Sequence, residues 1–195
     1  LALLFSTLIP EEAAAQTPET ALRDITVEEL QAWAPDAPSG LIRSLLEKND
    51  LHIYYAEYPE ALTAVDKAEE LAFSTPGIDS LLQAEVMLYK SYTLRTLGKL
   101  KGARSGFIRT LSLCGADGPV KASALMELAY LDSEYGFVIK PDSLFQAAEA
   151  ILQKHPYTDS SDIVGYYITK GHLFYGKSRN DSAAVYYSKA LSLNR

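Results

Sequence analysis

Apolar residues recur along most of this chain at steps of three and four positions, the spacing that places side chains on one face of an α-helix. The alternation of apolar and polar residues that marks a half-buried strand is not sustained. Short stretches rich in Gly, Pro, Ser and Asp separate the periodic segments and indicate turns. The pattern predicts helices over residues 27–34, 41–57, 57–72, 81–98, 99–113, 120–137, 140–155, 162–178 and 179–193.

The last eight predicted helices form four pairs that repeat one another. In the second helix of each pair, a small or apolar anchor is followed four and seven positions later by further core residues. The four sets are Ala61, Val65, Ala68; Ala103, Phe107, Thr110; Leu144, Ala148, Ile151; and Ala183, Tyr187, Ala190. Their anchors are 42, 41 and 39 residues apart. Such regular self-similarity predicts a solenoid, in which each hairpin buries its apolar face against its neighbours.

These repeats resemble the tetratricopeptide repeat family over about residues 41–195. Segment 57–62, EYPEAL, is similar to the aromatic-x-x-Ala start of that family's second helix. The last repeat carries the family's pattern at Tyr167, Gly171, Phe174, Ala183, Tyr187, Ala190 and Leu191. The resemblance implies an all-α, right-handed helical solenoid of about four antiparallel helix-turn-helix hairpins. The period of about 40 residues exceeds the family's usual 34, so a related helical repeat is an alternative.

Residues 171–178, GHLFYGKS, match the phosphate-loop pattern G-x-x-x-x-G-K-[ST]. A nucleotide-binding enzyme built on this string would need a strand over residues 162–170 and a helix directly after Ser178. The bulky side chains between the two glycines and the turn signal RND after Ser178 disfavour that alternative.

The repeat pattern predicts a different role for the same letters. Gly171 is the small residue where the second helix approaches closely, and Gly176 begins the turn. Asp181 or Ser182 is expected to cap the next helix.

The amino terminus resembles the end of a secretory signal peptide. Residues 1–9 are apolar, and Ala13 to Ala15 supply the small residues of a cleavage site. We therefore expect residues 1–15 to be a signal-peptide remnant, with an N-terminal arm or frayed helix as the alternative. Residues 16–40 are expected to be a loose polar segment followed by a short helix, which Thr26 and Glu29 open as a capping box. Residues 41–195 form the repeat domain, and we expect it to be truncated at its carboxyl end.

The charge balance narrows the choice of partner. The net charge is −7 and the pI is about 5.0, which argues against binding nucleic acid or an anionic membrane surface. A single cysteine, Cys114, excludes an internal disulfide, and the three histidines share no metal-ligand spacing. We expect no metal, no cofactor and no enzymatic activity, because no catalytic motif is present.

The resemblance also implies a peptide groove, because first helices line the concave face in that family. Carried onto this sequence, the groove candidates are Arg43, Asp50, Glu85, Tyr92, Arg95, Ser133, His172 and Tyr175. The Lys and Asn set with which well-known members hold a C-terminal carboxylate is missing, although Arg43 and Arg95 could pair with an acidic ligand group. Neighbouring tyrosines, such as Tyr54 and Tyr55, are expected to have one ring packed inward and one at the surface.

The sequence therefore predicts an exported, non-catalytic module that binds a protein or peptide in the periplasm or cell envelope of a bacterium. One alternative is the sensory arm of a membrane-spanning bacterial regulator, whose transmembrane and signalling parts would lie beyond residue 195.

Overall fold

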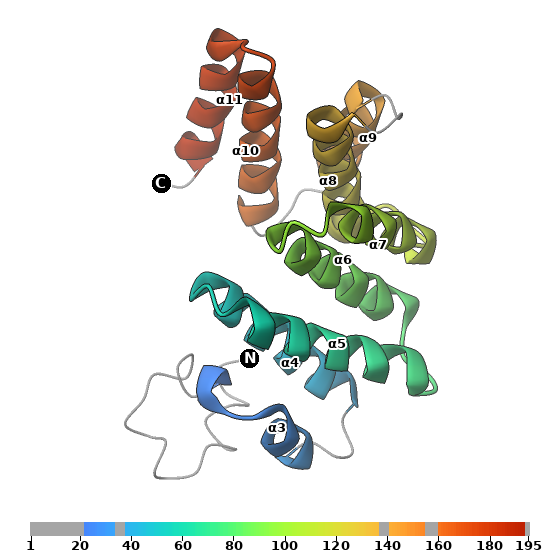
Figure 1. Ribbon diagram of the computed structural model, residues 1–195. Coiled ribbons are helices and arrows are strands. Elements are labelled where there is room, and N and C mark those ends of the chain that lie inside the picture. The colour runs from blue at the N-terminus through green and yellow to red at the C-terminus, as the bar shows by residue number, and fades with distance from the viewer. Residues whose placement is uncertain (1–21, 34–37, 137–140, 155–159, 194–195) are drawn as a thin grey trace. The chain divides into compact units, whose positions relative to one another are not determined.

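The computed structural model describes residues 22–33, 38–136, 141–154 and 160–193, and the regular structure in these ranges is helical (Figure 1). The helices are α3 (Val27–Trp33), α4 (Pro38–Tyr54), α5 (Tyr58–Ser74), α6 (Ser80–Thr96), α7 (Leu100–Leu113), α8 (Pro119–Tyr135), α9 (Pro141–Lys154), α10 (Ser160–Gly176) and α11 (Asn180–Leu193). Every predicted helix is present, and no end differs from its predicted position by more than three residues. The all-α prediction is confirmed. The expected signal remnant, residues 1–15, lies outside the described residues.

The chain divides into two compact units, residues 1–98 and 99–195. The boundary falls between α6 and α7, the two helices of the second predicted pair. The first unit contains α3 to α6 and the second contains α7 to α11. Each unit is described by itself below.

The first unit is built on the hairpin of α4 and α5, against which α6 packs. The three anchor residues of α5, Ala61, Val65 and Ala68, have no exposed surface. Their small side chains allow the neighbouring helices to approach closely, since interaxial distance depends on side-chain size at the contact. Ile42 and Leu45 of α4 are equally buried, and full burial of each such side chain contributes ~1.5–3 kcal/mol.

The buried side-chain amide of Asn49 links α4 to its hairpin partner α5 and to the neighbouring helix α6. Asn49 of α4 donates hydrogen bonds to the carbonyl oxygen of Ala61 in α5 at 2.9 Å and to the hydroxyl of Thr93 in α6 at 2.8 Å. The Thr93 hydroxyl in turn donates to the carbonyl oxygen of Tyr89 at 3.1 Å. Asn49 is only 1% exposed, so water cannot replace these partners.

The N-terminal segment is held against α4 by a buried lysine. The Lys48 amine donates to the carbonyl oxygens of Leu22, at 3.1 Å, and Arg23. Leu22 is itself buried in the core, and Leu22 to Asp24 are helical, so the expectation that this stretch is loose was wrong. Burial lowers the pKa of Lys48, against the raising effect of nearby carboxylates.

The capping box at the start of α3 is confirmed. The Glu29 backbone N–H donates to the Thr26 hydroxyl at 3.1 Å, and the Thr26 backbone N–H donates to the Glu29 carboxylate at 2.8 Å. These reciprocal bonds satisfy two donors that the first turn of a helix leaves without partners.

The second unit contains the hairpins α8–α9 and α10–α11, with α7 packed on α8 and α10 packed on α8. Phe107 and Ala148 have no exposed surface, as their places in the repeat predicted. The register in α9 differs by one residue, because Leu144 is only half-buried and Phe145 is 3% exposed. Arg104 of α7 donates to the carboxylate of the buried Asp132 in α8 at 2.8 Å.

The glycine string forms the end of a helix and not a phosphate loop. Residues 162–170 lie in α10, so the strand that the nucleotide-binding alternative required is a helix. Ser178 has a φ of 56°, its N–H donates to the carbonyl of Tyr175, and the N–H of Arg179 donates to the carbonyl of Phe174. This is the Schellman pattern that closes a helix C-terminus. A C-terminus presents carbonyl oxygens of partial negative charge, which repel phosphate.

The helix after this turn begins two or three residues earlier than a cap at Asp181 or Ser182 implied. Asn180 is the first residue of α11, which places Asp181 and Ser182 inside its first turn and not at the cap. Asp181 still favours this end of the helix, because a carboxylate complements the positive N-terminal dipole.

Each glycine of the string makes room for a side chain of another helix. A Cβ at Gly171 would lie 2.5 Å from Cε1 of Tyr187 in α11, so the predicted close approach is confirmed. A Cβ at Gly176 would lie 2.5 Å from Oε1 of Glu134 in α8. Both distances are shorter than a carbon atom tolerates.

Replacing the buried amide should weaken the first unit. Asn49→Leu is expected to lower the free energy of unfolding by about 1–3 kcal/mol, because the Ala61 carbonyl and the Thr93 hydroxyl lose a buried donor. Urea unfolding of the full chain would measure this loss. Gln146→Leu, at an exposed position of α9, is the matched control and should change stability by less than about 0.5 kcal/mol. Equal effects of the two variants would contradict the role of Asn49.

Two alanine substitutions in α10 should have opposite effects on the stability of the protein. Gly171→Ala is expected to destabilise by about 1–3 kcal/mol through the clash with Tyr187. Gly165→Ala meets no atom within 4 Å and should stabilise by up to about 1 kcal/mol, since Ala is the better helix former. Thermal melts followed by circular dichroism would compare them. Stabilisation by both would show that the Gly171 contact is not close.

Candidate functional site

In each unit, two helices that open predicted hairpins lie side by side: α4 with α6 in the first unit and α8 with α10 in the second. Their outward sides are here called the first-helix surfaces. The eight groove candidates lie on these four helices. The two surfaces are described separately.

In the first unit, Arg43 of α4 forms an ion pair with Glu85 of α6. The guanidinium Nη1 lies 3.0 Å from the Glu85 carboxylate, and the Arg43 side chain is 54% exposed. The structure therefore brings two predicted groove residues together. Arg43 is already paired with a carboxylate of its own chain. An acidic ligand group would therefore have to compete with Glu85 for Arg43.

Asp50 on the same surface interacts with Tyr89 of α6, a residue that the sequence reasoning missed. Removal of water from the carboxyl group raises the pKa of Asp50 to about 6, against the lowering effect of a hydrogen bond from Tyr89, and nearby Glu47 raises it further. Burial also raises the pKa of the Tyr89 hydroxyl. The Asp50 residue as a whole is exposed, whereas its carboxyl group, which Tyr89 contacts, is shielded from water.

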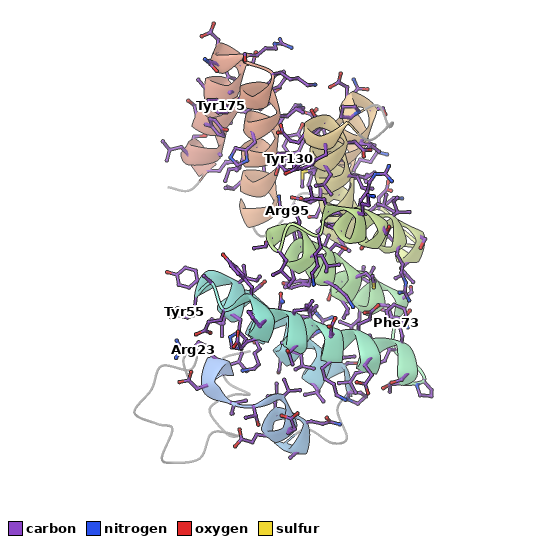
Figure 2. The ribbon with its side chains drawn as sticks, viewed as in Figure 1. Arg23, Tyr55, Phe73, Arg95, Tyr130 and Tyr175 are labelled. Carbon is purple, nitrogen blue, oxygen red and sulfur yellow. The ribbon has the colours of Figure 1, made fainter. Side chains whose placement is uncertain are left out.

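Tyr92 and Arg95 lie one turn apart on α6 and contact each other. The guanidinium carbon of Arg95 is 5.6 Å from the centre of the Tyr92 ring, within the range of a cation–π interaction. The ring therefore receives its cation from the same helix. Arg95 is labelled in Figure 2.

In the second unit, His172 of α10 lies between two tyrosines. Its ring centre is 6.5 Å from Tyr130 of α8 and 5.6 Å from Tyr187 of α11. Burial raises the pKa of the Tyr187 hydroxyl, and the charge of Tyr175 adds to the rise. Tyr175 of α10 is 66% exposed. Figure 2 labels Tyr175 on α10 and Tyr130 on α8.

The carboxylate of Glu134 lies on the same surface, against Gly176 of α10. Glu134 is exposed, whereas the predicted candidate Ser133 beside it is half-buried. Tyr130, Glu134 and Tyr187 were all missed as site residues. A sequence signal existed for two of them, since Tyr130 and Glu134 are four residues apart and therefore share one face of α8.

The tyrosine pairs follow the predicted pattern only in part. Tyr166 is 2% exposed and Tyr167 is half-buried, as expected for one inward and one outward ring. Tyr54 and Tyr55 are both exposed, at 82% and 44%, and contact each other edge to face with ring centres 5.1 Å apart. This second prediction was wrong. The guanidinium of Arg23 lies over the Tyr55 ring, 4.9 Å from its centre (Figure 2).

A further group of aromatic residues holds α11 against α10. Tyr186 stacks on Phe174 with ring centres 5.3 Å apart and an interplanar angle of 5°. The amines of Lys170 and Lys189 lie 4.9 and 5.2 Å from the centre of the Tyr186 ring. These contacts account for the half-burial of Tyr186, so we assign this group to hairpin packing and not to the site.

Comparison with known proteins supports the fold. No protein-family model and no curated protein matches the sequence. Among solved structures, BtubC (BKLC) from P. vanneervenii has a TM-score of 0.69 and 18% identity, over 90% of this chain and 72% of that chain. MamA from Desulfovibrio magneticus RS-1 has a TM-score of 0.57 and 17% identity, over 100% and 95% of the two chains.

The putative kinesin light chain TPR-like repeats of Podosopora anserina have a TM-score of 0.58 and 13% identity, over 86% and 84% of the two chains. The chain therefore has a tetratricopeptide-like fold of paired helices. Among the helices described, none combines the length and the apolar character needed to cross a membrane.

Asp50 should make the stability of the first unit depend on pH. Its folded pKa is raised to about 6, above the ordinary value, so the folded state holds its proton more tightly than the unfolded state. Stability is therefore full below about pH 4 and falls as the pH rises towards the folded pKa. Asp50→Asn should flatten this fall in melts between pH 4.5 and 7.5. Asp142→Asn, at an exposed position in α9, should leave the profile unchanged. Identical profiles for the wild type and Asp50→Asn would contradict the raised pKa.

Proposed function

We propose that this protein is a non-catalytic scaffold that binds a protein or a peptide on its first-helix surfaces. The observation that carries the proposal is the exposure of aromatic and ionisable side chains there. His172 and Tyr175 are exposed in the second unit, and Asp50 is exposed in the first. Exposed tyrosines offer a large contact area at a low cost in conformational entropy.

The fold supports the same proposal. Repeats of paired helices stack into extended surfaces that such proteins use for binding. The solved structures with this fold include the TPR-like repeats of a putative kinesin light chain. At the identities given above, this likeness supports a scaffold and leaves the partner open.

The polar contacts of the first-helix surfaces favour binding over catalysis. Arg43 is paired with Glu85, and Asp50 accepts a hydrogen bond from Tyr89. His172 contacts aromatic rings, whereas a catalytic base would lie within hydrogen-bond reach of a nucleophile.

Export is a further part of the proposal, and it is supported by the sequence alone. The apolar run over residues 1–9 and the small residues Ala13 to Ala15 are typical of a signal peptide. A scaffold so targeted would meet its partner in the cell envelope.

Site-specific photo-crosslinking in cells of the source organism would test the scaffold proposal. A photoreactive amino acid at Tyr175 or Tyr92 should yield one discrete crosslinked protein, because both positions lie on first helices. The matched controls are Thr63 and Val185, which are exposed on the second helices α5 and α11. Equal crosslinking from all four positions, or none from the first-helix positions, would contradict the proposal.

A further inference from the structure

A row of aromatic rings and basic side chains runs along one side of the hairpin of α10 and α11. The guanidinium carbon of Arg179 lies 4.9 Å from the centre of the Phe174 ring. Phe174 stacks on Tyr186, and the amine of Lys189 lies 5.2 Å from the centre of the Tyr186 ring. The same amine lies 5.5 Å from the centre of the Tyr167 ring. We call these five residues the cation–aromatic row, in which the rings position two basic groups.

The row is separate from the first-helix surface of the second unit. Lys170 and Phe174 are four residues apart and share one side of α10. His172, a residue of the first-helix surface, is two positions from each of them, which is about 200° around the helix. On the side of the row, the amine of Lys170 lies 4.9 Å from the centre of the Tyr186 ring and pairs with Glu149 of α9. A ligand on the row would therefore leave the first-helix surface open.

The two basic groups at the ends of the row are available to a ligand. Arg179 and Lys189 are exposed, and within the part of the chain that the structure describes neither forms an ion pair. An aromatic ring attracts a cation through its quadrupole and leaves the positive charge in place. Contact with the rings also restricts these long side chains, which lowers the conformational entropy that they lose when an anion binds.

The lysine of α5 that is equivalent to Lys189 has a carboxylate three residues away, and Lys189 does not. The repeat anchors align α5 with α11, so that Lys67 corresponds to Lys189 and Glu70 corresponds to Ser192. The Lys67 amine donates to both carboxylate oxygens of Glu70, each at 3.0 Å. On α11 the Ser192 hydroxyl donates to the carbonyl oxygen of Lys189 at 2.8 Å. The positive charge of Lys189 is therefore not neutralised in the way that the charge of Lys67 is.

The net charge of this hairpin is opposite in sign to that of the whole chain. Residues 160–193 contain four basic and two acidic residues, a net charge of +2, whereas the chain has a net charge of −7. At physiological ionic strength, exposed charges more than about 8 Å apart are largely screened from each other. The local positive charge of the hairpin therefore acts on a ligand at the row more strongly than the distant acidic residues do.

We propose that the cation–aromatic row binds an acidic segment of a partner protein. Carboxylates of the segment pair with the guanidinium of Arg179 and the amine of Lys189, and its methylene groups contact the rings between them. An extended segment of six residues is about 20 Å long, enough to reach from one cation to the other across two stacked rings.

A nucleic acid is the less favoured ligand, because its charged backbone would extend beyond the row over an acidic protein. The inference goes beyond the proposed scaffold function, since it assigns a second binding face and the chemistry of its partner.

Binding of fluorescent hexa-glutamate to the full chain tests the row, at about 150 mM salt to limit long-range effects. The wild type should bind, and Lys189→Gln and Arg179→Gln should each weaken binding about two- to fivefold, the range of a single exposed ion pair. Lys101→Gln removes a positive charge from an exposed position on α7 and should have little effect. Equal losses from all three variants, or no binding to the wild type, would overturn the proposal. Thermal melts would verify that the variants fold.

A carboxylate introduced beside Lys189 gives a second test. Ser192→Glu supplies the residue that α5 has at Glu70, and it should weaken hexa-glutamate binding about two- to fivefold by pairing with Lys189. In the Ser192→Glu background, Lys189→Gln should cause little further loss, because the lysine is already neutralised. Losses that multiply in the double variant would contradict the assignment of Lys189 to the row.

A twelve-residue oligothymidylate tests the other ligand class. It should bind more weakly than hexa-glutamate, because the acidic surface around the hairpin repels a longer polyanion. Tighter binding of the oligothymidylate, weakened by Lys189→Gln, would make the row a nucleic-acid site and overturn the acidic-segment proposal.

The crosslinking experiment separates this inference from the scaffold proposal. Val185 lies four residues before Lys189 on the same side of α11, so it also reports on the row, and Thr63 remains the control. A crosslink from Val185 that disappears in Lys189→Gln, while the crosslink from Tyr175 persists, supports the row as a second face. A crosslink from Val185 that Lys189→Gln leaves unchanged would contradict it. If Tyr175 and Tyr92 give no crosslink, the scaffold proposal fails whatever hexa-glutamate does.

Discussion

The close approach of paired helices at small side chains is the constraint on which the rest of this structure depends. Ala61 and Ala103 have no exposed surface, and Ala183 is 2% exposed. A helix hairpin of this length has one apolar face, so it is stable only if that face is covered tightly. In the hairpin of α10 and α11, the first helix also has a small residue at the contact, Gly171. The ring of Tyr187 occupies the space beside this glycine. Asn49 and Thr93, which are buried at this packing, have protein hydrogen-bond partners, as buried polar groups generally do.

Polar links recur where hairpins meet within each unit, and they follow from the same geometry. Lys90 of α6 pairs with Asp66 of α5 at 2.7 Å, and Lys170 of α10 pairs with Glu149 of α9 at 3.2 Å. The two lysines occupy corresponding positions of corresponding helices. Such half-exposed pairs add little stability individually, since exposed ion pairs contribute ~0–1 kcal/mol. They do select one register of stacking, because a one-turn slip would separate each lysine from its carboxylate.

The sequence predicted the helices well, because helical periodicity is visible within a short segment. It predicted the site poorly, because the site contacts join residues that are far apart in the sequence. Every helix was placed within three residues, yet the left-handed residues that end two helices, Ala56 and Ser178, are not glycines and gave no signal. The groove candidates came from a family pattern that says which helix faces outward. It does not say which residues of adjacent first helices meet. Arg43 and Glu85 are 42 residues apart, so their pairing depends on the lateral register of α4 and α6. The same reason explains why Glu134 was missed.

The string GHLFYGKS shows that one sequence motif can lie in opposite electrostatic environments. In a phosphate loop, glycines expose backbone N–H groups at the start of a helix, where the dipole is positive. Here the same glycines lie in the last two turns of a helix, where the carbonyl oxygens are exposed and the dipole is negative. Gly176 makes the negative potential at this end of the helix stronger, because a residue without a side chain leaves space for the Glu134 carboxylate.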